Sequence, residues 1–265
     1  DTYNYSLVFL DPADGREQRI LVPTCQIDQF SSATLDTDSG LLYLKSENAL
    51  FLIYDSSYGC IQRLDFATGQ VTWQTVTQGG FNFSPDGFNV LLTGSTIYFN
   101  DGSQLLSVDK STGAVNILAT NEDYDLLPLA LAGDNLLVRA RRTRGSERFA
   151  LWALDPVSGA QRWQLDLQGA APVDPPDEMS GLVDDTDSGW TWRLLPAGLM
   201  LVRFQAAPNQ LVLETIDPAD GTSLNQLAVP LQQVTGDFYS VPVVIGWKED
   251  TVYLNLDSTL YALDT

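Results

Sequence analysis

Histidine is absent from the 265 residues of this chain. Its absence excludes Ser-His-Asp and Cys-His catalysis and removes the usual ligand of zinc and copper sites. Long apolar runs are also missing, because no stretch reaches the length of about 18 apolar residues that a membrane-spanning helix needs. The sequence therefore predicts a chain without these catalytic centres and without a spanning helix.

Basic residues are scarce as well. Lysine and arginine together number 14, against 34 aspartate and glutamate residues, which gives a formal net charge of -20. Nucleic acids and anionic membrane surfaces both bind basic patches, so neither is expected as a partner. So acidic a chain is expected to bind cations or basic partners, or its charge simply keeps it soluble.

A strand–turn–strand pattern organises the sequence, and residues 151–163 (LWALDPVSGAQRW) show it most clearly. The first five residues alternate between two faces, which is the period of a β-strand. In the turn, the Asp155 side chain can accept hydrogen bonds from backbone amides, and Gly159 supplies the positive φ that closes the turn. Trp163 is then expected to anchor the return strand in the core.

The pattern recurs along the whole chain, with an aspartate at the end of one strand and a glycine four positions later. Successive aspartates lie 44 to 62 residues apart, a spacing typical of units built from four short strands. A second tryptophan, Trp73, occupies the position of Trp163 in an earlier copy. We assign structural roles in these turns to Asp11, Gly15, Asp65, Gly69, Asp109, Gly113, Asp155, Gly159, Asp217, Gly221 and Asp264.

The motif L-x-x-L-D-x-x-T/S-G-x-x-x-W resembles the quinoprotein-like (PQQ-type) propeller repeat, a relative of the WD repeat. The resemblance covers nearly the whole chain. It implies an all-β fold: a single β-propeller over residues 1–265, with five or six blades of four antiparallel strands. Quinoprotein dehydrogenases are much longer and use adjacent cysteines and a calcium ligand set around the quinone. No two cysteines are adjacent here, so we expect no quinone cofactor and keep calcium as the one candidate.

Both ends of the chain carry incomplete blades. Residues 1–23 predict a hairpin of two strands, and the last blade has three strands. Three explanations stay open: the hairpin completes the C-terminal blade within the chain, it completes that blade in a neighbouring subunit, or the chain is cut from a larger propeller. Unpaired sheet edges recruit strands from other chains, so exchange between copies predicts self-assembly into filaments.

Three aspartates in the longest interruption of the repeat form the best candidate for a metal site. Asp184, Asp185 and Asp187 place closely spaced carboxylates before Gly189, and calcium prefers such oxygen ligands. The glutamate that ends a calcium-binding loop is missing. The stretch also resembles the Asp-box of sialidase-type propellers, which is a structural hairpin in that family. A calcium site and a solvated turn both stay open.

Five of the basic residues lie within ten positions: Arg139, Arg141, Arg142, Arg144 and Arg148. On a strand, Arg139 and Arg141 share one face. In so acidic a chain these arginines are a candidate docking patch for the acidic surface of another copy, such as residues 174–187. The alternative is a solvated hairpin with local pairing to Glu147.

Cysteine occurs twice, as Cys25 and Cys60, each next to a predicted strand end in neighbouring repeats. A disulfide between them would close a loop of about 35 residues and contribute roughly 3 kcal/mol. Disulfides are typical of secreted proteins, and the sequence begins with Asp1 rather than methionine. We therefore expect an extracellular or cell-surface protein whose signal peptide has been removed. Two buried free thiols are the alternative.

Three hypotheses about function follow. The first is a non-catalytic, secreted protein-protein interaction or self-assembly module, in which terminal strands complement a neighbour's sheet. The second is a calcium-dependent carbohydrate hydrolase or lyase with its site at the propeller axis. The third is the ligand-sensing ectodomain of a larger surface protein. We assign no catalytic residue, so the chain is expected not to be an enzyme.

Overall fold

The fold is described from a computed structural model. The described residues are 7–10, 13–21, 41–46, 49–54, 60–65, 68–76, 90–101, 104–142, 149–167, 190–205, 210–230, 243–248, 251–256 and 259–264. These residues form strands and turns, and no helix occurs among them. None of them, accordingly, belongs to a helix that could cross a membrane. The expectation of an all-β fold is confirmed.

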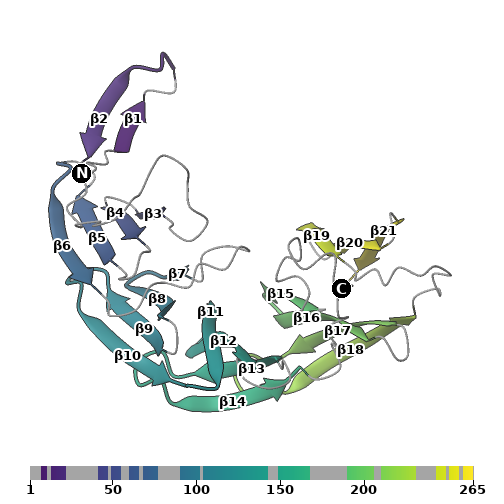
Figure 1. Ribbon diagram of the computed structural model, residues 1–265. Helices are drawn as coiled ribbons and strands as arrows, with labels where there is room; N and C mark the ends of the chain where they lie inside the picture. Colours follow the sequence, from purple (N-terminus) through teal and green to yellow (C-terminus); the bar gives the residue numbers. More distant parts are fainter. Residues whose placement is uncertain are drawn as a thin grey trace, which may run out of the picture. The chain divides into compact units, whose positions relative to one another are not determined.

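Four antiparallel sheets of four strands make up most of the described structure (Figure 1). In each sheet the strands pair in the order of the sequence, as the blades of a propeller do. The first sheet contains β3 (Leu41–Ser46), β4 (Ala49–Tyr54), β5 (Cys60–Asp65) and β6 (Val71–Val76). The second contains β7 (Val90–Leu92), β8 (Thr96–Asp101), β9 (Gln104–Asp109) and β10 (Val115–Thr120).

The third and fourth sheets repeat this arrangement further along the chain. The third contains β11 (Tyr124–Ala132), β12 (Asn135–Arg142), β13 (Phe149–Leu154) and β14 (Gln161–Asp166). The fourth contains β15 (Trp190–Leu195), β16 (Gly198–Gln205), β17 (Gln210–Ile216) and β18 (Ser223–Pro230). The predicted four-stranded antiparallel blades are therefore confirmed.

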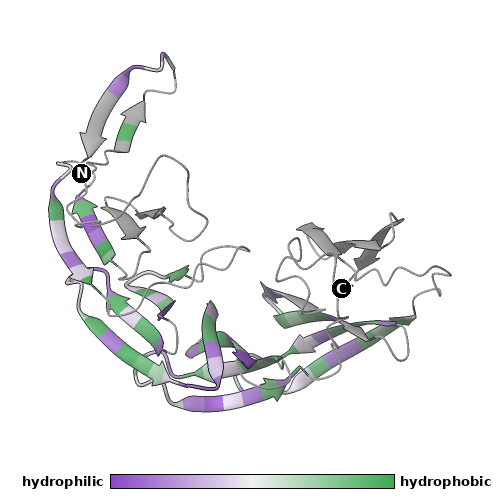
Figure 2. Ribbon diagram, viewed as in Figure 1, coloured by the Kyte–Doolittle hydropathy of each residue, from purple (hydrophilic) through white to green (hydrophobic). Residues whose placement is uncertain are grey.

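Burial divides the strands by their position in a sheet. The middle strands β9, β13 and β17 are buried along most of their length, whereas the fourth strand β14 alternates between exposed and half-buried residues. Figure 2 shows polar segments along β14. Because a middle strand is covered on both faces, its sequence is a nearly continuous apolar run, and only the outer strand alternates clearly.

Among the described residues, two clusters of buried side chains form much of the core, each between neighbouring sheets. The first cluster joins the first and second sheets, and Trp73 packs against it. The second cluster joins the third and fourth sheets, and Trp163 and Trp192 pack against it. Its buried members are Ala132, Leu137, Phe149, Leu151, Ala153, Leu167, Leu199, Leu201 and Ile216. Both tryptophans of the repeat thus contact the core, as the sequence predicts, although each ring is only partly buried.

The chain divides into two compact units, Asp1–Pro128 and Leu129–Thr265. The boundary falls within β11. The first cluster lies in the first unit and the second cluster in the second.

The terminal sheets are smaller. Strands β19 (Val243–Lys248), β20 (Thr251–Leu256) and β21 (Thr259–Asp264) form a three-stranded sheet, and β1 (Leu7–Leu10) and β2 (Glu17–Leu21) form a hairpin. Strand β21 ends at Asp264, the repeated aspartate, so β19–β21 correspond to the first three strands of a blade. Gly15, between β1 and β2, has a φ of 71°, like the glycines between the third and fourth strands elsewhere. The hairpin therefore corresponds to the last two strands of a blade, and the described strands agree with the predicted hairpin and the predicted three C-terminal strands.

Candidate functional site

The repeated aspartate stabilises the turn between the third and fourth strands of each sheet. The Asp109 Oδ1 atom accepts hydrogen bonds from the backbone amides of Ser111 and Thr112, at 2.9 and 2.8 Å, and from both hydroxyl groups. Gly113 closes the turn, because its amide donates to the Asp109 carbonyl at 2.8 Å with a φ of 75°. The hydroxyls of Ser111 and Thr112, followed by the backbone amides, lower the pKa of Asp109 to about 2.

The same turn in the third sheet also contains a cation. The Asp155 Oδ1 atom accepts bonds from the amides of Val157 and Ser158 and from the Ser158 hydroxyl, at 3.0, 2.7 and 2.9 Å. The Asp155 Oδ2 atom pairs with Arg162 at 2.5 Å. The backbone amides of Ser158 and Val157, the Ser158 hydroxyl and Arg162 hold the pKa of Asp155 far below its usual range. Both carboxylate oxygens of Asp155 are thus bound by groups of the chain itself.

The turn in the fourth sheet departs from this pattern. Asp220 stands where Thr68, Thr112 and Ser158 stand in the other sheets. As a result Asp217 receives no hydroxyl hydrogen bond from that position, and the Ala219 amide, at 2.8 Å, is the donor to its carboxylate among the described residues. The Asp220 carboxylate instead accepts hydrogen bonds from the hydroxyl and the amide of Thr222, and these bonds lower the pKa of Asp220. A carboxylate offers about four acceptor positions, so Asp217 keeps most of its capacity free.

The backbone of this turn is held in place by the third sheet. The Trp163 Nε1 atom donates to the Pro218 carbonyl at 3.2 Å. The Asn135 side chain, which is buried, donates to the carbonyls of Pro218 and Ala219 at 2.6 and 3.1 Å. Arg162 in turn donates to the Asn135 Oδ1 atom at 2.7 Å. The turn that contains Asp217 is therefore fixed by side chains that start from β12 and β14.

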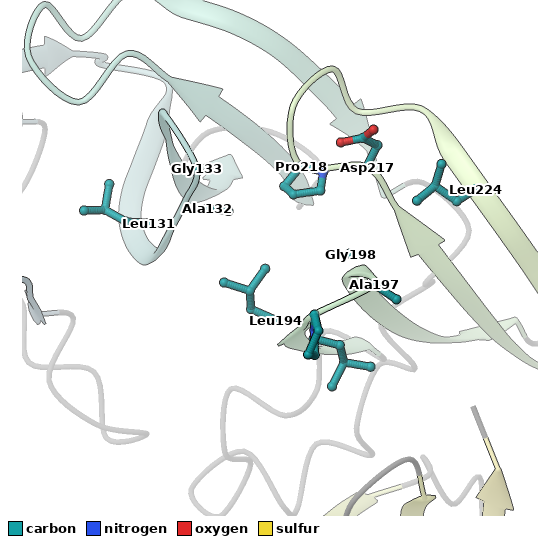
Figure 3. Close-up of a pocket in the computed structure, with 11 residues that line it drawn as sticks. Leu131, Ala132, Gly133, Leu194, Ala197, Gly198, Asp217, Pro218 and Leu224 are labelled. Atoms are coloured by element: carbon teal, nitrogen blue, oxygen red, sulfur yellow. The ribbon is translucent and has the colours of Figure 1, made fainter.

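An open pocket of about 380 Å³ lies beside this turn, within the second compact unit. Figure 3 shows that its lining comes from separate turns: β11–β12, β15–β16 and β17–β18. The lining residues are Leu131, Ala132, Gly133, Leu194, Leu195, Pro196, Ala197, Gly198, Asp217, Pro218 and Leu224. Leu194 and Leu224 are 37% and 55% exposed. The lining thus combines polar groups with apolar side chains around a single ionisable side chain, Asp217, a mixture that ligand sites also contain.

Several residues that the sequence singled out lie outside the described residues. These are Asp184, Asp185 and Asp187 of the candidate calcium site, Cys25, Arg144, Arg148 and Asp11. Cys60 is described and lies buried at the start of β5. Within the described ranges no group of three or more His, Cys, Asp or Glu residues is placed to hold a metal ion. The calcium site and the disulfide therefore stay predictions.

The described arginines of the candidate docking patch lie on both faces of β12. Arg139 and Arg141 are paired with Leu151 and Phe149 of β13, so they share the face that carries the second core cluster. Arg142 is on the opposite face by the alternation of the strand. The predicted common face of Arg139 and Arg141 is confirmed, while a role in docking stays a prediction.

The pocket beside Asp217 was not found by sequence reasoning. Its residues come from positions 131–133, 194–198, 217–218 and 224, and no local pattern indicates that these turns meet. One signal was present. Asp220 breaks the Ser/Thr position of the repeat, and that departure could have marked this turn as different.

Sequence comparisons find no relative, because no family model and no curated protein matches the chain. Solved structures are similar to it. An acylaminoacyl peptidase in complex with Z-Gly-Gly-Phe-chloromethyl ketone is matched over 87% of this chain and 39% of its own, at 11% identity and a TM-score of 0.50. A quinohemoprotein alcohol dehydrogenase from Comamonas testosteroni is matched over 86% and 43%, at 15% identity and a TM-score of 0.45. The WD40 domain of SCAP from fission yeast is matched over 86% and 56%, at 10% identity and a TM-score of 0.44.

The chain spans less than two thirds of the length of each of these three solved chains. At such low identity the likeness bears on the fold. The four-stranded antiparallel sheets, paired in sequence order, and the repeated Asp–Gly turn are those of β-propeller repeats. The resemblance to quinoprotein-like and WD-type repeats is confirmed at the level of the fold.

Proposed function

We propose that the chain is a non-catalytic, secreted binding module that assembles with further copies of itself by adding strands at sheet edges. The observation that carries this proposal is the pair of incomplete sheets, β19–β21 and β1–β2. The first has the order of the first three strands of a blade, and the second has the turn of the last two. Among the described strands, the C-terminal sheet has no fourth strand and the N-terminal hairpin has no first or second strand.

Unpaired backbone groups at these edges supply the binding energy in this proposal. Strand β21 pairs with β20 from Thr259 to Asp264, and β1 pairs with β2 from Leu7 to Leu10, and among the described strands neither has a second partner. Native sheets protect open edges with lysine or proline. The sequences of the two strands, TLYALD and LVFL, contain neither. Both edges are therefore suited to main-chain pairing with another strand.

A second copy of the chain is the partner that fits both edges. A β1–β2 hairpin placed beside β21 of a neighbour extends that neighbour's sheet, and each copy then still offers its own unused hairpin or β21 edge to a further copy. Such a head-to-tail contact continues into a filament unless it closes into a ring. Pairing of the two edges within one chain is the competing arrangement, and it gives a monomer.

Light scattering after gel filtration, with negative-stain images of the same sample, tests this proposal. We expect rings or filaments. A particle of 29.1 kDa at every concentration would contradict self-assembly. The variant Ala262→Lys puts a charge on an exposed position of β21 and should reduce assembly. The control Val157→Lys adds the same charge to a turn residue that is 78% exposed, and it should leave assembly unchanged.

The calcium-dependent carbohydrate enzyme and the sensor ectodomain stay alternatives to this proposal. Calorimetric titration with calcium alone separates the first alternative from the assembly module. Heat from a tight calcium site would favour the enzyme, and its absence at millimolar calcium would remove that alternative. A sensor ectodomain would require the natural reading frame to continue into further domains.

A further inference from the structure

We propose that the pocket beside Asp217 binds a primary alkylammonium group, with the ammonium on the Asp217 carboxylate and the alkyl chain against the leucines. This site is separate from the edges of β21 and β1. The proposal rests on a comparison of equivalent positions in the repeat, on the composition of the pocket walls and on the rigidity of the turn.

The third sheet contains its own cation–carboxylate contact at the equivalent position. Arg162, seven positions after the repeated aspartate, pairs with the Asp155 carboxylate at 2.5 Å. The equivalent position in the fourth sheet is Leu224, which is 55% exposed and lines the pocket. Asp217 also lacks the hydroxyl donor of the Ser/Thr position, and no ion pair to it is found among the described residues. An external cation can therefore take the place that Arg162 has in the third sheet.

The free acceptor suits a cation that directs one N–H group at the carboxylate. The Asp217 Oδ1 atom accepts the Ala219 amide at 2.8 Å, which leaves Oδ2 as the open acceptor, the position at which Asp155 binds Arg162 in the third sheet. A quaternary ammonium is recognised by aromatic faces, and no aromatic side chain is part of the lining. A primary ammonium needs only one good acceptor and can direct its other N–H groups to water.

The pocket walls suit an alkyl chain. Leu194 of β15 and Leu224 of β18 are partly exposed and line the pocket, so both can contribute apolar surface to it. The volume of about 380 Å³ is large enough for a chain of several carbons. Asn135 and Trp163 hold the Pro218 carbonyl, so the turn is ordered before a ligand arrives. A preformed site loses little affinity to ordering on binding.

Titration of the full chain with n-hexylammonium, followed by calorimetry and by NMR chemical shifts, tests the site. We expect saturable binding that weakens from hexylammonium to methylammonium, since the shorter chain buries less apolar surface. Hexanol should bind at least about tenfold more weakly, because it cannot form a charge-assisted hydrogen bond. The ammonium group could come from a lysine side chain of a peptide or from a free amine, and Nα-acetyl-lysine methylamide distinguishes these two sources. If it binds, the ligand is a peptide lysine. If it does not bind while hexylammonium does, the ligand is a free amine.

Two variants locate the ligand. Asp217→Asn should lower the affinity at least about tenfold, while the neighbouring change Asp220→Asn should have little effect. Leu224→Arg restores the cation of the third sheet and should abolish binding without loss of thermal stability. No saturable binding at tens of millimolar, equal binding of hexanol, or unchanged affinity in both Asp217→Asn and Leu224→Arg would each overturn the proposal. Ala262→Lys should not alter amine binding, so failure here is distinguishable from failure of self-assembly.

Discussion

The indole ring of Trp163 in β14 covers Gly221 in the turn of the next sheet. A Cβ atom at Gly221 would lie 2.8 Å from the ring atoms Cδ2 and Cε3. Trp73 and Gly113 repeat this relationship in the first compact unit, where the corresponding distance is 2.7 Å. In both cases the indole Nε1 donates to the carbonyl of the residue after the repeated aspartate. Tryptophan and glycine of the motif are thus the two halves of one contact between neighbouring sheets.

Replacement of this glycine should be far more costly than replacement of an equivalent glycine that has no tryptophan above it. Gly221→Ala combines a φ of 77° with a clash against the ring, whereas Gly15→Ala has a φ of 71° and nothing within 4 Å of the new Cβ. The backbone strain costs about 1–2 kcal/mol in both variants. The clash should add about 1–3 kcal/mol in Gly221→Ala alone. Urea denaturation of the two variants measures the difference, and equal losses would show that the ring contact contributes nothing.

Removal of one partner of the buried ion pair between Arg203 and Glu214 should lower the free energy of unfolding more than removal of both. Their side chains are 12% and 9% exposed. Glu214→Leu leaves the arginine buried without its carboxylate and should lower the free energy of unfolding by about 3–5 kcal/mol. The double variant Arg203→Met, Glu214→Leu should recover most of that loss. Additive losses in the denaturation double-mutant cycle would contradict this expectation.

Protonation of Asp109 should destabilise its turn at low pH. Its pKa is lowered from 3.8 to about 2 in the folded chain, so its contribution to stability is present above pH 3.8 and is lost as the pH falls towards 2. Ser111→Ala removes the strongest cause of the shift and should move the pKa upwards, towards 3.8. NMR titration of the carboxyl carbon measures this change. The control Ser95→Ala should leave the Asp109 titration as it is, and an unchanged curve in Ser111→Ala would contradict the assignment.

Oxidised protein should contain no free thiol. If Cys25 and Cys60 are joined, alkylation in denaturant modifies neither cysteine until a reductant is added, and mass spectrometry distinguishes the two states. Reduction should lower the free energy of unfolding by roughly 3 kcal/mol. The variant Cys60→Ala should show the lower stability without reductant and should no longer respond to it. Two alkylated cysteines in the oxidised sample would establish free thiols instead.

The strands and turns could be predicted because their signals are local. The alternation that predicts a strand over residues 41–46 matches β3, and the Asp155–Gly159 turn forms with the predicted hydrogen bonds. These features depend on residues within a few positions of each other. Incomplete blades at the ends were likewise visible from the count of strands.

The contacts between sheets could not be predicted in the same way. The Trp163 ring contacts Gly221, which lies 58 positions later. The sequence of a single repeat does not indicate which turn its tryptophan will cover. Alternation shows that Arg139 and Arg141 share a face of β12, but not that this face carries a core cluster. The pocket beside Asp217 likewise needs turns from two sheets in one place.

The placement of the two tryptophans has a consequence for cooperativity. Trp73 joins the first sheet to the second, and Trp163 joins the third to the fourth, so each compact unit contains one such joined pair. At the same position in the second sheet stands Ile117, which is 54% exposed. We therefore expect the elementary folding unit to be a pair of sheets rather than a single sheet, as in repeat proteins whose stability is the sum of the repeats and of the contacts between neighbours. Hydrogen exchange should accordingly report two opening reactions, with the amides of each pair exchanging together.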